Sequence, residues 1–73
     1  MEKYQANYHG KIFTIEAQEF KDEKNKTIIW YYLYAWNEKS IEHDYLQDNL
    51  EMAKQCAFDE FNIPFDYWQQ INT

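Results

Sequence analysis

Along the first half of the chain, apolar and polar residues alternate with a period of two. Residues 3–8 and 11–20 place an apolar side chain at nearly every second position, which predicts two half-buried β-strands. Residues 27–37 are rich in β-branched and aromatic side chains, contain no Gly or Pro, and predict a third, longer strand. The dipeptide His9-Gly10 supplies a turn between the first two strands. The pattern therefore predicts a three-stranded antiparallel meander.

The second half of the chain changes to a helical period. Leu50, Ala53, Ala57 and Phe61 recur at spacings of three and four residues. This spacing puts the four side chains on one side of a helix, so it predicts a single amphipathic helix over about residues 48–61.

Capping signals stand at both ends of this helix. Asp48 with Glu51 forms the preferred capping box at the start, and Asp44 with Gln47 forms an alternative one. At the other end Pro64 cannot continue a helix, because it lacks a backbone N–H and its ring clashes with the preceding turn.

The segments that flank the helix leave two further elements to assign. Residues 40–47 are either a loop or a short strand, which would make the sheet four-stranded. Residues 64–70 predict a short C-terminal helical turn, because the fixed φ of a leading proline suits the first helical position. We expect the apolar side chains of this tail to fold back onto the edge of the core beside the helix; they are Phe65, Trp68 and Ile71.

Length and composition favour one domain over residues 1–73. A chain of 73 residues with 45% apolar and 21% aromatic residues can bury one core and is not disordered. A single Cys excludes a disulfide framework, and a single Gly excludes Gly-rich phosphate loops. The expected fold class is therefore α+β: an antiparallel meander sheet of three or four strands, followed by the amphipathic helix and the short helical turn.

The net charge of −6 belongs wholly to the C-terminal part of the chain. Residues 1–41 hold six Lys and six acidic residues, whereas residues 42–73 hold one Lys and seven acidic residues. An acidic surface on a chain without Arg disfavours nucleic-acid binding and favours a basic protein partner. These carboxylates form either an ordinary solvated surface or an acidic binding face; the candidate residues are Glu42, Asp44, Asp48, Glu51, Asp59 and Glu60.

The strand over residues 27–37 is apolar on both sides, and one helix can cover only one of them. We expect the helix on the side that ends in Ala35, because that side matches the second strand in side-chain size. The other side then exposes an aromatic face, and exposed apolar patches usually mark interaction sites. In the alternative register this aromatic side packs under the helix. The candidate residues of the aromatic face are Trp30, Tyr32, Tyr34 and Trp36, widened by Tyr4 and Tyr8.

No residue pattern points to catalysis or to a metal. Ser40 and Cys56 lack the sequence signatures of an activated nucleophile. Cys56 also falls on the apolar flank of the helix, where a free cysteine usually packs as a small hydrophobe. His9 and His43 lack the spacing of metal ligands. We therefore expect a protein without enzymatic activity, without a cofactor and without a metal.

Location and partner are the remaining expectations. The first residues lack a secretory signal, and the longest apolar run, residues 28–36, has nine residues, about half the length of a membrane-spanning helix. These features predict a cytoplasmic protein that does not enter membranes. The expected function is that of a small acidic protein-binding protein, such as an inhibitor of the immunity or anti-defence type. The alternatives are a homodimeric structural or regulatory protein and a module that stacks a ligand on its aromatic face.

Overall fold

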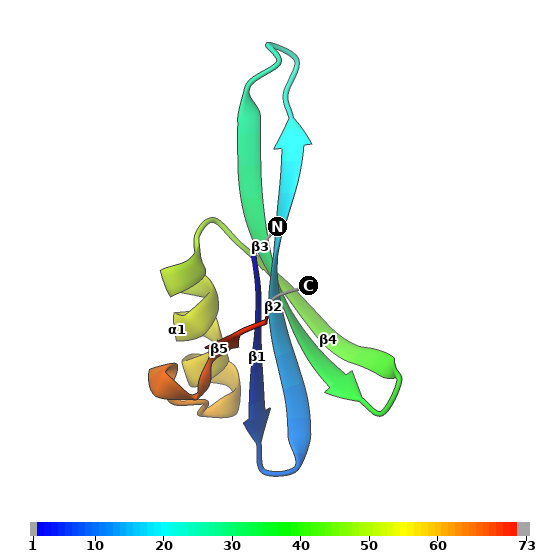
Figure 1. Cartoon of the computed structure of the whole chain (residues 1–73), viewed down its shortest axis with the longest axis vertical. Helices are drawn as coiled ribbons and strands as arrows, with labels where there is room; N and C mark the ends of the chain where they lie inside the picture. The colour runs from blue at the N-terminus through cyan, green and yellow to red at the C-terminus, as the bar shows by residue number, and fades with distance from the viewer. Residues whose placement is uncertain (1, 72–73) are drawn as a thin grey trace.

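The computed structural model describes residues 2–71 and shows an antiparallel sheet with one helix on one side of it (Figure 1). The α+β class is confirmed, but the sheet has five strands instead of three or four, in the order β4-β3-β2-β1-β5. In chain order the elements are β1 (Lys3–Tyr8), β2 (Lys11–Lys21), β3 (Thr27–Asn37), β4 (Ser40–Gln47), α1 (Leu50–Phe61), the 3-10 helix η1 (Phe65–Tyr67) and β5 (Gln69–Gln70).

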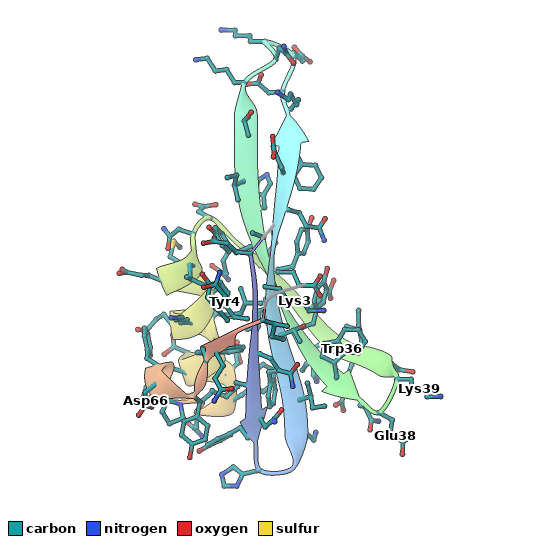
Figure 2. All side chains as sticks on the ribbon, viewed as in Figure 1. Lys3, Tyr4, Trp36, Glu38, Lys39 and Asp66 are labelled. Carbon is teal, nitrogen blue, oxygen red and sulfur yellow. The ribbon has the colours of Figure 1, made fainter. Side chains whose placement is uncertain are left out.

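The segment that the pattern left as a loop or a strand is β4. It pairs with β3 across a tight turn, in which Glu38 has a positive φ of 58°. Figure 2 shows Glu38 and Lys39 at the tip of this turn. Tight hairpin turns usually contain an Asn-Gly or Asp-Gly pair, which makes them recognisable in the sequence. This turn has no glycine, which is why the sequence pattern alone did not decide for a strand.

The C-terminal segment differs from the helical turn predicted over residues 64–70. Only η1 is helical, and the chain then runs as β5 beside β1. The backbone N–H of Ile71 donates a hydrogen bond to the carbonyl of Lys3 at 2.7 Å. The outer edge of β1 has backbone groups that need partners, so strand pairing replaces a longer helix. Trp68 is buried at the edge of the core as expected, whereas Phe65 is exposed.

Helix α1 begins two residues later than predicted. Its N-cap is Asn49, whose side-chain oxygen accepts a hydrogen bond from the Met52 N–H at 2.8 Å, so the predicted N-cap at Asp48 is wrong. Asp and Asn cap helices about equally well. Sequence preference therefore does not decide between Asp48 and Asn49, and the path of the chain from β4 into the helix does. At the other end Asn62 adopts the left-handed conformation, with φ 60°, and its N–H donates to the carbonyl of Phe58 at 2.9 Å.

The core lies between α1 and one side of the sheet. Small side chains on both surfaces let the helix approach closely; they are Ala6 and Ala35 on the sheet and Ala53 and Ala57 on the helix. Ile15, Leu33 and Ile63 are the largest side chains that are fully buried, and burying one such side chain contributes roughly 1.5–3 kcal/mol. The helix therefore covers the Ala35 side of β3, as the size argument predicted, and the reversed register is not observed.

The hairpin of β2 and β3 extends well beyond the rest of the sheet (Figure 1). β1 pairs with β2 only as far as Glu16, and β4 pairs with β3 only from Tyr31 onward. Beyond these points the two strands pair with each other alone and form a two-stranded arm. At its tip the carboxylate of Asp22 accepts hydrogen bonds from the N–H groups of Lys24 and Lys26. The arm gives the molecule its elongated shape, with extents of 43 × 23 × 22 Å.

Candidate protein-binding surface

The side of the sheet opposite α1 carries no other element of residues 2–71, and we call it the open face. Directly opposed residues of antiparallel strands share a side of the sheet, so the register assigns residues to this face. From β3 it holds Trp30, Tyr32, Tyr34 and Trp36, and their partners on β2 are Gln18, Glu16, Thr14 and Ile12. Four of the predicted aromatic residues are thus brought together on the side that the helix leaves free.

Three of the open-face rings of β3, those of Tyr32, Tyr34 and Trp36, pack along the strand as a ladder. The rings of Tyr32 and Tyr34 are parallel, with centroids 5.9 Å apart and an interplanar angle of 4°. The ring of Trp36 meets that of Tyr34 edge-on, with centroids 6.2 Å apart. Each of these rings is half-buried by its neighbours. The ladder is therefore ordered by its own contacts before any partner arrives.

Trp36 is further held by a hydrogen bond across the sheet. Its indole Nε1–H donates to the hydroxyl Oγ1 of Thr14 at 2.8 Å. Thr14 is only 4% exposed although it lies on the open face, because the indole lies across it. Figure 2 shows Trp36 on the side of the sheet away from α1. A tryptophan fixed in this way presents a rigid apolar surface and loses little conformational entropy on binding.

Exposed aliphatic and aromatic side chains surround the ladder. Between 36% and 49% of each of these side chains is exposed, and the register places them on the open face: Ile12, Phe20, Ile28, Ile41 and Leu46. Together with the ladder they make an apolar surface that runs across three strands. Soluble monomers rarely expose large contiguous apolar patches unless these are functional.

Two carboxylates stand within this apolar surface. Asp44 lies directly opposite Tyr34 on β4, and Glu16 lies directly opposite Tyr32 on β2. Burial raises the pKa of the Tyr34 hydroxyl, and the negative charges of Glu16 and Asp44 raise it further. The open face therefore combines aromatic rings with negative charge, which is the environment that a lysine or arginine side chain prefers.

Tyr4 and Tyr8 do not belong to the aromatic face, so their predicted place there is wrong. Tyr4 is paired with Ile15, and both tyrosines pack against the core on the helix side. The physical reason is the register of β1, which puts Ala6 opposite Phe13 and thereby joins its apolar side to the core. Figure 2 shows Tyr4 directed towards α1.

The predicted acidic residues do not form a single face. Glu51 lies in the first turn of α1, at the opposite end of the helix from Asp59 and Glu60. Glu42 and Asp44 lie on β4, and the exposed pair of Glu42 with Lys11 has an N–O distance of 3.4 Å. Asp48 lies in the connection between β4 and α1. Two of these carboxylates therefore lie on β4 and two near the C-terminal end of α1, whereas Glu51 lies at the N-terminal end of the helix.

The groups considered for catalysis are dispersed. Burial raises the pKa of the Cys56 thiol, and the charge of Glu60 raises it further, so the reactive thiolate is disfavoured at neutral pH. His43 faces the ring of Phe61 with centroids 6.0 Å apart, and His9 lies in the β1–β2 turn. Within residues 2–71 no three His, Cys, Asp or Glu side chains come close enough to hold a metal ion.

Sequence reasoning missed several members of the open face. Ile12 and Glu16 alternate with the core residues of β2, so the strand pattern already placed them on the outer side, and the pairing with β3 set them beside the ladder. Ile41 and Leu46 lie in the segment whose structure the pattern left open. These residues could have been identified by applying the alternation of apolar and polar positions to each strand once the pairing with β3 is known.

Comparisons with family models, with curated proteins and with solved structures found no match to this chain. In the described residues, no helix has the length and apolar character that crossing a bilayer requires. The function is therefore argued from the surface itself.

Proposed function

We propose that this chain is a small, non-enzymatic, cytoplasmic protein that binds a partner protein through its open face, in the manner of an inhibitor of the immunity or anti-defence type. One observation carries the proposal: one side of the sheet holds the core, and the other holds an ordered aromatic ladder with an exposed apolar rim. The uncovered side of an antiparallel sheet is ordinarily polar. Tyr and Trp are the residue types that contribute most of the energy at protein interfaces.

Charge narrows the chemistry of the partner. Glu16 and Asp44 lie among the rings, and the whole chain carries a net charge of −6. A basic partner gains attraction during approach and can place lysine or arginine side chains over the rings. A second copy of this chain would bring the same carboxylates towards each other, so a basic protein is preferred over a homodimer.

Capture with matched variants tests the open face. The double variant combines Ile12→Glu with Leu46→Glu. Both substitutions change exposed positions, on β2 and β4, so the fold should persist. Phe65→Glu is the control, because Phe65 is similarly exposed but belongs to η1. From lysate of the source cells, the wild type and the control should retain the same protein, and the double variant should retain it at least about tenfold less, a loss of roughly 1.4 kcal/mol.

Two results would overturn the proposal. Equal retention by the double variant would show that the open face is not the binding surface. Sedimentation of the wild type as a dimer, with the double variant as a monomer, would show that the open face serves self-association instead.

A further inference from the structure

One edge of the sheet is long and unpaired. The outer edge of β4 has no strand beside it in residues 2–71, whereas the opposite edge of the sheet is the two-residue strand β5. The pairing of β4 with β3 is regular over residues 43–47 and becomes irregular only next to Ile41. An unpaired edge presents a row of backbone N–H and C=O groups, which is a template for another strand. Residues 43–47 therefore offer a regular segment for strand addition.

Acidic residues lie on both sides of this edge. On the open face Asp44 projects from β4 itself. On the helix side a groove of about 270 Å³ runs between the end of β4 and α1, and it is lined by Gln47, Met52, Gln55, Cys56, Asp59 and Glu60. Tyr45, on the helix side of β4, meets the ring of Phe61 edge-on with centroids 6.0 Å apart, so the end of α1 that carries Asp59 and Glu60 packs against this strand. A strand added here would meet negative charge above and below its plane.

Two of these carboxylates carry charge where it does not help the fold, although Asp59 accepts a hydrogen bond from the side chain of Gln55 at 2.9 Å. Asp59 and Glu60 lie near the C-terminal end of α1, and no basic residue lies in the last turn of the helix. The C-terminal end of a helix carries partial negative charge, so acidic side chains there are destabilising. A basic partner would remove this unfavourable interaction. Residues that lower the stability of the free protein in this way are expected where a site serves binding more than stability.

A second copy of this chain is a poor occupant of the edge. Each copy carries a net charge of −6, with Asp44 on the edge strand and Asp59 and Glu60 beside it, so pairing two β4 edges brings the carboxylates of both copies together. The accumulated negative charge disfavours association of two copies at this edge. An extended segment that alternates basic and apolar residues avoids this repulsion, because its basic side chains can reach Asp59 and Glu60 while its backbone pairs with β4.

We propose that residues 43–47 of β4 accept an extended basic segment of the partner protein as a sixth strand of the sheet. Because side chains alternate between the two faces of a strand, its lysine or arginine side chains lie on the helix side beside Asp59 and Glu60, and its apolar side chains lie on the open face beside Leu46. This inference rests on the proposed function, because it names the part of the partner that binds next to the open face. Backbone pairing supplies affinity, and the acidic groove selects for charge.

A model peptide tests the edge without knowledge of the partner. The probe is a peptide of about eight residues in which lysine and valine alternate, a length typical of a strand. Its binding to the full chain is followed by amide NMR shifts, which should be largest at residues 43–47. A peptide of alternating glutamate and valine should bind at least about tenfold more weakly. A lysine peptide with two valines replaced by proline keeps its charge but cannot pair as a strand, and it should also bind at least about tenfold more weakly.

Variants of the protein complete the test. The double substitution Asp59→Asn with Glu60→Gln should weaken binding of the lysine peptide about tenfold. It should not lower the melting temperature of the protein. Glu51→Gln, at the other end of α1, should leave peptide binding unchanged. Equal binding of the proline peptide, or no effect of the Asp59 and Glu60 changes, would overturn strand addition at this edge. If partner capture still depends on Ile12 and Leu46 in that case, the open face is retained as the binding surface and only the edge is excluded.

Discussion

At the scale of single residues, the contact between Thr14 and Trp36 explains how an uncovered sheet face keeps an ordered tryptophan. The hydroxyl of Thr14 accepts the indole N–H at 2.8 Å, and the indole in turn shields Thr14 from water. Such a bond across two strands couples the position of a binding side chain to the pairing of β2 with β3. The open face is therefore part of the folded structure and not a set of loose side chains.

We expect Thr14→Val to lower the free energy of unfolding by about 1 kcal/mol, because the indole N–H loses its acceptor while the shape and strand propensity of the side chain are kept. Trp36 should also become more mobile, which would appear as a red shift and lower anisotropy of tryptophan fluorescence. Thr14→Ser retains the hydroxyl and serves as the control. Identical denaturation curves and fluorescence for Thr14→Val and the wild type would show that the bond contributes nothing.

At the scale of elements, the N-terminal end of α1 distinguishes the capping residue from the acidic residue beside it. Asn49 accepts the Met52 N–H, whereas Asp48 precedes the cap and makes no such bond. We expect Asn49→Ala to lower the free energy of unfolding by about 1 kcal/mol. Asp48→Ala is the matched control and should change it by less than about 0.5 kcal/mol. Urea denaturation of the two variants measures the difference, and equal effects would contradict the assignment of the cap.

The two-stranded arm should be the least stable part of the sheet. Residues 18–30 pair only within the hairpin, and the exposed side chains of Phe20 and Ile28 bury little surface there. An isolated hairpin is marginally stable in water, so the arm should open without unfolding of the rest. Hydrogen exchange should be faster for amides of the arm than for those of residues 12–16 and 32–36 in the same strands. Equal protection along both strands would mean that the arm has support from elsewhere.

At the scale of the whole molecule, the titration of partly buried tyrosine and cysteine side chains sets the response to alkaline pH. Burial is the largest cause that raises the pKa of Tyr4, Tyr31, Tyr34 and Tyr45 above 10.0 and that of Cys56 above 9.0. Folding thus favours the protonated forms. Their contribution to stability is complete below the unfolded pKa values and is lost as pH rises through the folded ones.

We therefore expect the melting temperature to be lower at about pH 10.5 than at about pH 8, because these groups ionise more readily in the unfolded chain. Tyr31 donates a hydrogen bond to Glu2 at 3.0 Å, which adds to its raised pKa. Tyr31→Phe should accordingly reduce the alkaline loss, although it removes that bond at every pH. Thermal unfolding followed by circular dichroism at both pH values measures the effect. A melting temperature independent of pH in this range would contradict the argument.

Sequence patterns predicted most of the elements because local periodicity reflects burial directly. The strands over residues 3–8 and 27–37 agree with β1 and β3, and residues 11–20 agree with β2 except for its last residue. The helical period of Ala53 and Ala57 identified the side of α1 that is buried. The choice of the Ala35 side of β3 for the helix followed from side-chain size, because that side matches the helix-facing residues of β2.

The register between strands and the pairing of β4 and β5, in contrast, were not accessible from local pattern. Tyr4 and Tyr8 were placed on the wrong side because the side of a strand depends on its register with its neighbour, and a shift of one residue exchanges the two sides. β5 was expected as a helical turn because Pro64 favours both a helix start and a turn, and only the free edge of β1 decides for a strand.

What the sequence by itself determined about this protein is its class: one helix on a small antiparallel sheet, with a strand over residues 27–37 too apolar for one helix to cover. Only the tertiary structure decided which side of that strand stays open, that Glu16 and Asp44 lie among its rings, and that β4 forms an unpaired edge between Asp44 and the carboxylates of α1. The physical reason is that burial is encoded residue by residue. A surface, however, is made by residues distant in the chain that meet only when the strands pair.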